Sequence, residues 1–476
     1  MKIKNSSRIY FIIFISLTLS LSLSYYFISL YDGYNLNGVT HIMLKEETLS
    51  HWYQGAKIIE QIKSGIPFYI AGDELFTKPL PQRIVVLYSY LTNFEIINDW
   101  NSIKINLGGK LPFLFTQSII YFIVLYFFYK QISKKISSNI VFFIIAFLSL
   151  EPTLFQYHSS FWTESFYFSL QLLILTLMLD DKEKKINFAI IGLLLGILFI
   201  QRTAGFFYFI VVFIYYFFTI KNQKYLKVSI LISFYLIIFL SVGLHNFKRM
   251  GLFYVMPLET KYCVYSYFSK GILQKVNNFT PVEIDQQEVK KSLLWLEKNG
   301  VNIDYLKGQK IDAPYGIGLR LNNEKDKIKF YSYLNKRAYK ILLENPLATF
   351  KELVKGTIHF SVLNPFFIYY DYEYYKDYSS GVIGDFVYSD KHKELIPYRI
   401  IYSLIIYSFV FFGIISCYRK DPKLCLLLIG SILYYYLISG WYGKTRLFVP
   451  ILIYLSIFFG YGIDFLKTYS KKNLIK

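Results

Sequence analysis

The residues of this sequence that are best suited to chemistry are carboxylates next to long apolar runs. Asp32 directly follows the first such run, and Glu46 and Glu47 come shortly after it. A carboxylate at a membrane face can take a proton from an attacking hydroxyl group, so each acid is a candidate general base. We place Asp32 first because it adjoins the apolar run. A simple Asp-Gly turn explains Asp32 as well, and an exposed acidic pair before a helix explains the two glutamates.

Three basic residues are candidates for binding an anionic group such as a phosphate. They are Lys78 in a Lys-Pro pair, Arg202 between two apolar runs and Arg446 just before another run. Lys and Arg stabilise a departing phosphate through charge-assisted hydrogen bonds. An arginine near an apolar run costs free energy unless it is paired or functional. The competing interpretations are an interfacial lysine that extends to the membrane surface and two ordinary anchors in outer turns.

A polar patch between two apolar runs contains Glu151, His158 and Glu164. Carboxylate and imidazole groups could hold a divalent ion near a phosphate, although their spacing here matches no diagnostic metal motif. Glu164 also opens a predicted helix, where the helix dipole favours an acid. We assign His158 and Glu164, together with His245 and Asn246 farther along the chain, to positioning of a donor or acceptor; a plain helix cap is the competing interpretation for the last two.

The elements that must position these residues are membrane-spanning helices. The chain of 476 residues is 54% hydrophobic and only 18% charged. It contains repeated apolar runs of about 20 residues, the length that crosses a bilayer, so we predict an all-α polytopic membrane protein with about ten spans. The candidate spans are residues 9–30, 112–129, 140–156, 162–180, 187–201, 204–220, 228–246, 398–417, 424–440 and 447–466.

Charged residues set the expected orientation. With the N-terminus inside, the short inner loops carry clusters of lysine and arginine, as the positive-inside rule requires. The net charge of +20 is explained by these loops and by contact with anionic lipid, so nucleic acid is not expected as a partner. The chain then divides into an N-terminal transmembrane module at 1–246, an outer domain at 247–397 and C-terminal transmembrane helices at 398–476.

The first outer loop, residues 31–111, is too long to be a simple connector. The pattern predicts an amphipathic helix from Ser50, a good N-cap, to Lys63, with Trp52 and other apolar residues on one face. Gly65 is the natural stop for this helix. Such a helix is expected to lie flat on a membrane surface.

The outer domain at 247–397 is expected to contain helices at 283–298 and 325–355. A tyrosine-rich stretch at 366–380 follows them. Tyrosine rings can stack on sugars, but they are also ordinary residues of a membrane interface, and we favour the second interpretation.

In chain order, these features resemble those of the GT-C glycosyltransferases, and most of all the branch with lipid A aminoarabinose transferase and protein O-mannosyltransferases. The matching features are the acidic first loop, Ser64-Gly65, Lys78-Pro79, Thr163-Glu164, the Gly-rich span before Arg202, Asn246 to Gly251, and Arg446 before Pro450. The adjacent Asp-Glu pair of that family is absent before Ser64-Gly65, which is why three acids compete for the role of base. The chain also resembles phage-type glucosyltransferases that decorate O-antigen.

The resemblance implies a GT-C-type bundle with juxtamembrane helices in the first outer loop. It implies a donor sugar on polyprenyl phosphate, undecaprenyl phosphate in a bacterium, and inversion at the anomeric carbon. The acceptor would be a hydroxyl of an envelope glycan or lipid, such as O-antigen or lipid A, reached from the bacterial inner membrane on its periplasmic face. No cofactor is certain, and a divalent metal stays open. The alternatives are an O-antigen polymerase and a transporter.

Overall fold

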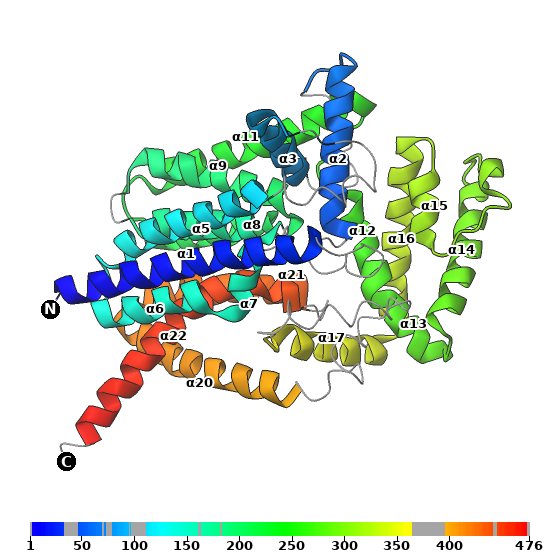
Figure 1. Ribbon diagram of the computed structural model, residues 1–476. Helices are drawn as coiled ribbons and strands as arrows, with labels where there is room; N and C mark the ends of the chain where they lie inside the picture. Colours follow the sequence, from blue (N-terminus) through cyan, green and yellow to red (C-terminus); the bar gives the residue numbers. More distant parts are fainter. Residues whose placement is uncertain are drawn as a thin grey trace.

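The computed structural model describes residues 2–32, 46–68, 71–72, 79–94, 96, 111–159, 163–180, 183–363, 396–440 and 445–473. Within these ranges the regular structure is all helical, as the sequence predicts. The helices form a bundle, a pair that lies across one end of it, and an outer domain beyond that end (Figure 1). The tyrosine-rich stretch at 366–380 lies outside the described residues.

Six of the described helices are long and apolar enough to cross a membrane. They are α1 (Lys2–Asp32), α5 (Leu111–Ile132), α11 (Lys224–Met250), α20 (Ile396–Lys420), α21 (Pro422–Ser439) and α22 (Thr445–Asn473). The other predicted spans are shorter apolar helices, α6 (Ser138–Leu150), α8 (Glu164–Met178), α9 (Lys185–Gln201) and α10 (Tyr208–Thr219). The described residues are therefore all helical and include six helices that are long and apolar enough to span a membrane, while crossing by the four shorter helices stays a prediction.

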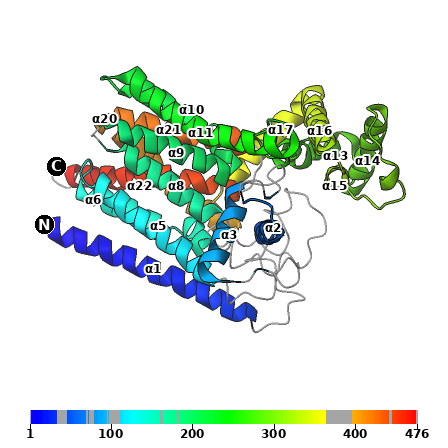
Figure 2. The ribbon, with the colours of Figure 1, turned by 90° about the horizontal axis from the view of Figure 1, so that it is seen from above.

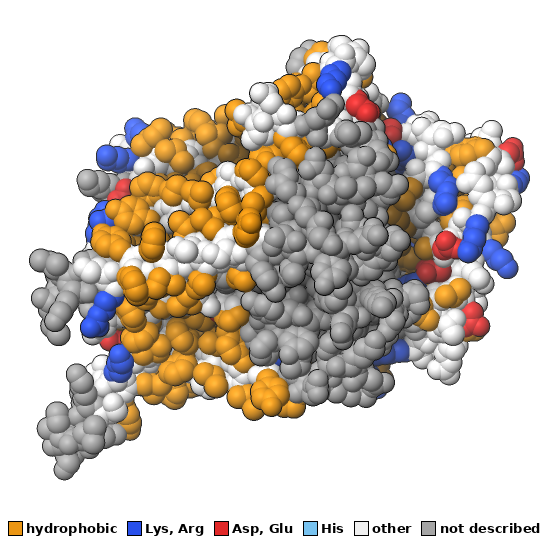
Figure 3. Space-filling view, in the orientation of Figure 1, with side chains coloured by type: hydrophobic (Ala, Val, Ile, Leu, Met, Phe, Trp, Pro, Cys, Tyr) orange, Lys and Arg blue, Asp and Glu red, His pale blue; other side chains and the backbone are white. Residues whose placement is uncertain are grey.

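The bundle has two chemically different ends. α1 begins and α22 ends at the same end, which we name the basic end (Figure 1 and Figure 2). Lysine and arginine side chains cluster there, next to a broad band of hydrophobic side chains (Figure 3). At the opposite end, which we name the outer end, α1 stops at Asp32 and α8 begins at Glu164. This is the polarity that the positive-inside rule predicts.

Two glycines set how closely α20 and α22 approach each other. A Cβ atom on Gly413 of α20 would overlap the carbonyl oxygen of Phe458 in α22. A Cβ atom on Gly462 of α22 would likewise overlap the carbonyl oxygen of Phe409 in α20. The two backbones are therefore in direct contact, which is a common arrangement of membrane helices because small residues allow extensive van der Waals packing.

Replacing Gly413 with Ala is expected to destabilise the protein by about 1–3 kcal/mol, because the added methyl group must push two backbones apart. The free energy of unfolding in mixed detergent micelles, measured by titration with a denaturing detergent, checks this expectation. Gly430→Ala in α21 is the matched control, since its nearest neighbouring atom would be 3.6 Å from the new Cβ. Equal stability of the two variants would show that the close contact of α20 with α22 is absent.

Two short helices lie across the outer end. α2 (Glu46–Lys63) runs nearly perpendicular to the spanning helices, and both ribbon views agree on this (Figure 1 and Figure 2). Trp52 of α2 is buried, and its ring packs edge-on against Tyr88 of α3 (Pro79–Thr92), with ring centroids 5.9 Å apart. Its ring also contacts Phe113 at the start of α5, with centroids 5.3 Å apart.

These contacts confirm part of the prediction for the first loop and correct another part. The helix exists and stops at Gly65, whose φ of +92° is a left-handed value that suits glycine. It begins at Glu46, so Ser50 lies inside the helix and is not its N-cap. Its apolar face packs against α3 and the first turn of α5, and its position flat on a membrane surface stays a prediction.

The outer domain consists of helices packed around their own apolar core. They are α12 (Leu258–Val264), a π-helical turn at Tyr265–Ser269, α13 (Lys270–Asn277), α14 (Pro281–Lys298), α15 (Pro314–Arg320), α16 (Glu324–Glu344) and α17 (Pro346–Ser361). The predicted helix at 283–298 is confirmed as α14, which a capping box from Thr280 to Glu283 starts. The predicted helix at 325–355 is two helices, because Pro346 cannot continue α16.

A buried carboxylate in the outer domain predicts that this domain loses stability in acid. Glu288 of α14 is 2% exposed and accepts hydrogen bonds from Arg337 of α16 at 3.1 and 3.2 Å. Burial alone would raise the pKa of Glu288, but Arg337 and Lys291 outweigh it and hold that pKa below the ordinary value of 4.5. A lowered folded-state pKa stabilises the fold above pH 4.5, and the stabilisation is lost as the pH falls through the folded-state value.

We therefore expect hydrogen-exchange protection of α14 and α16, corrected for intrinsic exchange rates, to fall as the pH drops below about 4.5. In the Glu288→Gln variant the protection should be lower at neutral pH and should change little as the pH falls below about 4.5. An unchanged acid dependence in this variant would assign the effect to other carboxylates.

Candidate functional site

Charged side chains are buried where several bundle helices meet the outer end. Glu151 follows α6, Glu164 opens α8, Arg202 follows α9 and Arg399 lies in the first turns of α20. Their exposed fractions are 4%, 0%, 4% and 6%, respectively. Buried charges require partners, so the contacts of these four residues define what this region can do.

The centre of this region is an ion pair between Glu164 and Arg202. Glu164 is the first residue of α8 and Arg202 follows the last residue of α9, so each charge has the sign that its helix dipole favours. The Arg202 guanidinium also lies over the ring of Tyr167, 5.7 Å from its centroid. Gln201 donates to the backbone oxygen of Thr163 at 3.0 Å, which joins the same two helix ends again.

This pairing changes the interpretation of Arg202. The sequence predicts a phosphate contact, and the structure gives the guanidinium a carboxylate partner within the protein. A guanidinium has five N–H donors, so one edge can hold Glu164 while another contacts a phosphate. Phosphate binding by Arg202 thus stays a prediction, and its pairing with Glu164 is the observed role.

His158 lies in the turn between α6 and α8 and is completely buried. Its ring stacks on Tyr121, with centroids 3.8 Å apart, and Nδ1 shares a hydrogen bond of 2.8 Å with the Ser165 hydroxyl. Burial lowers the pKa of His158 to about 3, so the imidazole is neutral near pH 7. Its Nε2 is buried without a hydrogen-bond partner among the described residues. His158 can therefore orient a polar group but cannot supply a positive charge.

Glu151 is held by contacts of a different kind. Its carboxylate accepts a hydrogen bond of 2.8 Å from Tyr402 of α20 and one of 2.7 Å from the Leu154 backbone N–H. The metal site that the sequence left open for Glu151, His158 and Glu164 is not formed. No three such side chains gather around one point in the part of the chain that the structure describes, and each of these three has a protein partner.

Asn246 and His245 lie near the end of α11. Asn246 is buried and donates a hydrogen bond of 2.6 Å to the backbone oxygen of Tyr254. α11 then ends at Gly251, whose φ of +69° allows the left-handed cap. Asn246 therefore holds the backbone of Tyr254 near the end of α11, where the chain leaves the bundle for the outer domain. His245 is partly exposed on α11. Positioning of an acceptor by either residue stays a prediction.

The remaining predicted residues are placed by backbone alone. Asp32 is the last residue of α1, Glu46 and Glu47 are the first two of α2, and Arg446 is the second of α22. α1 and α22 present these ends at the outer end of the bundle (Figure 1). The side chains of these four residues, and the whole of Lys78, lie outside the described part of the chain.

Sequence reasoning missed Arg399 and Tyr402 of α20. The Arg399 side chain donates to the backbone oxygen of Leu363 at 3.4 Å, and Tyr402 contacts Glu151. Their spacing of three residues places both on one face of the helix, toward the other buried charges. A single arginine at the start of the run 398–417 was the available signal.

A hydrogen-bonded cluster of tyrosines inside the bundle was also missed. Tyr167 and Tyr435 share a hydrogen bond of 2.7 Å, and Gln171 donates to Tyr435 at 2.9 Å and to Tyr454 at 3.1 Å. Tyr454 donates in turn to Tyr208 at 2.6 Å. The cluster joins α8, α10, α21 and α22 directly below the Arg202 guanidinium. Tyr167 and Gln171 at i and i+4 were its visible sequence signal.

The observed contacts hold the helix ends in fixed positions and place a neutral imidazole beside a buried ion pair, and binding of an anion there stays a prediction. The chain matches no protein-family model, no curated protein and no solved structure with which it was compared.

Proposed function

We propose that this protein is an integral-membrane glycosyltransferase that moves a sugar from a polyprenyl phosphate to a hydroxyl of an envelope glycan or lipid. One observation carries the proposal. Acids and cations that are far apart in the sequence belong to helix ends at a single end of the bundle, opposite the basic end. A lipid-linked substrate presents its phosphate at such a membrane boundary, where a base and cations would both be needed.

In the proposed reaction a carboxylate, first Asp32 and otherwise Glu46 or Glu47, takes the proton of the acceptor hydroxyl. The hydroxyl oxygen attacks the anomeric carbon from the face opposite the phosphate. A new carbon–oxygen bond forms while the bond to the phosphate oxygen breaks, and the phosphate leaves with the electron pair. Lys78 and Arg446 would stabilise the growing negative charge on the phosphate, and Arg202 would donate to it from the guanidinium edge that Glu164 does not occupy.

The distribution of buried charge separates this proposal from a transporter. Charged side chains on a transport path lie near the middle of the membrane. In the described part of the bundle the buried ones lie near helix ends instead, with Glu151, Glu164, Arg202 and Arg399 at the outer end and Lys227 at the start of α11. An O-antigen polymerase would also use outer arginines, so the two activities are distinguished only by an assay of the reaction.

The proposal is tested with purified protein in lipid nanodiscs and radiolabelled sugar on undecaprenyl phosphate. With an envelope glycan fraction as acceptor, we expect one undecaprenyl phosphate released per sugar transferred. Asp464→Asn is the matched control, because it neutralises a single carboxylate of α22 that pairs with Lys420 at the basic end. Transport of intact donor without cleavage, or joining of lipid-linked oligosaccharides without use of the monosaccharide donor, would refute the proposal.

A further inference from the structure

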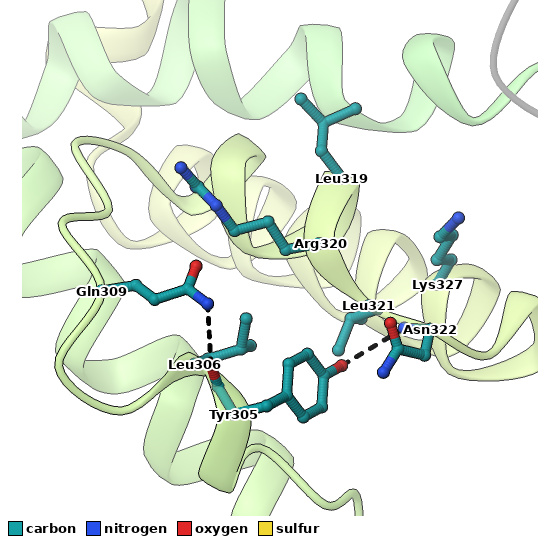
Figure 4. A pocket seen from close by; sticks show the side chains of 8 residues that line it. All are labelled: Tyr305, Leu306, Gln309, Leu319, Arg320, Leu321, Asn322 and Lys327. Atoms are coloured by element: carbon teal, nitrogen blue, oxygen red, sulfur yellow. Dashed lines mark hydrogen bonds between the residues drawn. The ribbon is translucent and has the colours of Figure 1, made fainter.

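A cavity in the outer domain is lined by groups that recognise carbohydrate. Its volume is about 550 Å³, within the range of ligand sites. It lies among the turn after Asp304–Leu306, the end of α15 and the start of α16. Figure 4 shows a tyrosine ring, two amides and an arginine around one space. α14, α15 and α16 lie beyond the outer end, away from the spanning helices (Figure 1), so a lipid tail is not the expected occupant of the cavity.

The orientation of the Tyr305 ring is fixed by its neighbours. The Tyr305 hydroxyl accepts a hydrogen bond of 3.2 Å from the Asn322 backbone N–H, and Leu306 beside it is buried in the domain core. Gln309 donates from Nε2 to the Tyr305 backbone oxygen at 2.8 Å, which leaves its Oε1 as an acceptor. Tyr305 as a whole residue is 37% exposed and lines the cavity, so a sugar ring can reach it.

Arg320 supplies the charge of the cavity. Its guanidinium is exposed, and the hydrogen bond that the structure describes for it goes to the Gly316 backbone oxygen, one turn earlier on α15, at 3.2 Å. The other cation at the rim, Lys327, is already neutralised by Glu324 at 3.0 Å. Arg320 therefore has donors left for a planar anion such as a carboxylate.

Gly316 lies within α15 with helical backbone angles, so any residue can adopt its conformation, and only the neighbouring side chains limit its size. A Cβ atom there would come 2.8 Å from Nη1 of Arg320 and 3.3 Å from Ile311. Alanine is a better helix former than glycine, so Gly316→Ala would displace the guanidinium without weakening α15. The chain thus offers a substitution that tests the position of Arg320 without removing its charge.

We propose that this cavity binds an acidic carbohydrate, with one sugar ring against Tyr305, polar contacts from Gln309 and Asn322, and a carboxylate on Arg320. This binding does not depend on the proposed transfer reaction. A transferase, a polymerase or a purely sugar-binding protein could use it, so its failure and the failure of the transfer reaction are separate results.

The test is saturation-transfer NMR on the full-length protein in nanodiscs, with trigalacturonic acid, maltotriose and inorganic phosphate as probes. We expect trigalacturonic acid to bind about 10-fold more tightly than maltotriose, the effect of one charge-assisted contact. Tyr305→Ala should weaken both sugars about 10-fold or more, whereas Arg320→Gln should weaken only trigalacturonic acid. Gly316→Ala should reduce the preference for trigalacturonic acid and leave maltotriose binding unchanged.

Tyr339→Ala and Lys329→Gln, two exposed positions on α16 outside the cavity, are the matched controls and should leave binding unchanged. Circular dichroism of each variant shows whether the helices are intact. Equal binding of the two sugars would overturn the assignment of Arg320 to a carboxylate. Displacement of trigalacturonic acid by an equal concentration of inorganic phosphate would make the cavity a simple anion site. Unchanged binding in Tyr305→Ala, or no binding of either sugar, would overturn the proposal as a whole.

Discussion

Replacing Asp32 with Asn is expected to abolish sugar transfer while expression and donor binding persist. The amide keeps the size of the side chain but cannot accept the hydroxyl proton, and loss of a general base slows a reaction by about 10²–10⁴-fold. Asp32 is the last residue of α1, and Asn has nearly the same size and shape, so we expect the variant to fold. Initial rates of transfer at saturating donor, together with binding of the donor to the variant, measure the two effects separately.

The control for this prediction is Asp464→Asn at the basic end, which should keep the full transfer rate. Full turnover by Asp32→Asn would move the role of base to Glu46 or Glu47. These two are the first residues of α2 and can be replaced by Gln one at a time. If none of the three single variants loses transfer, the carboxylate mechanism is wrong.

Breaking the ion pair of Glu164 with Arg202 is expected to be the most destabilising single change in the bundle. Both side chains are almost completely buried, so Glu164→Gln leaves a buried guanidinium without its anion. Loss of one partner of a buried pair costs about 3–5 kcal/mol. The same cost is expected for Arg202→Met, which leaves the carboxylate alone. The free energy of unfolding in mixed micelles measures both.

The double variant Glu164→Gln with Arg202→Met distinguishes loss of the ion pair from the separate effects of the two residues. It should recover most of the lost stability, because no uncompensated charge remains in the bundle. Lys340→Met is the control for an exposed pair, since Lys340 and Glu344 are 66% and 53% exposed, and it should change stability little. Additive losses in the double variant would mean that the two residues act independently.

The sequence predicts the parts of this structure that depend on local pattern. Apolar runs give the spanning helices because only helices satisfy their own backbone hydrogen bonds in lipid. Lysine clusters in the short loops predict which end of the bundle is basic. The stop at Gly65 and the helix at 283–298 are predicted because each depends on residues that lie close together in the chain.

Other parts depend on packing between distant segments and could not be predicted. α3 begins with Pro79 and Pro81, which the sequence pattern presents as a loop, although proline is well accepted in the first turn of a helix. Because α3 was not predicted, its packing against the apolar face of α2 was not predicted either. Glu164 and Arg202 were each recognised as unusual, yet their pairing follows from the packing of α8 against α9.

The tyrosine cluster illustrates a different limit. In an apolar run a tyrosine counts as hydrophobic, so Tyr208, Tyr435 and Tyr454 added to the prediction of spans and to nothing else. Their hydroxyl groups reach one another, or Tyr167 and Gln171 of α8, only after four helices have packed. A buried hydroxyl needs a partner, and that requirement restricts how these helices can be arranged.

The central claim is that the acids of the first loop and the cations at the later helix ends surround one lipid-linked phosphate. Photo-crosslinking with a polyprenyl phosphate that carries a diazirine beside the phosphate tests it most directly. We predict crosslinks to peptides from the end of α1, the start of α2 and the start of α22. Excess unlabelled polyprenyl phosphate should suppress the crosslinking of all three. Crosslinking confined to the basic end would contradict the account. So would crosslinking of only one of these segments that excess unlabelled polyprenyl phosphate does not suppress.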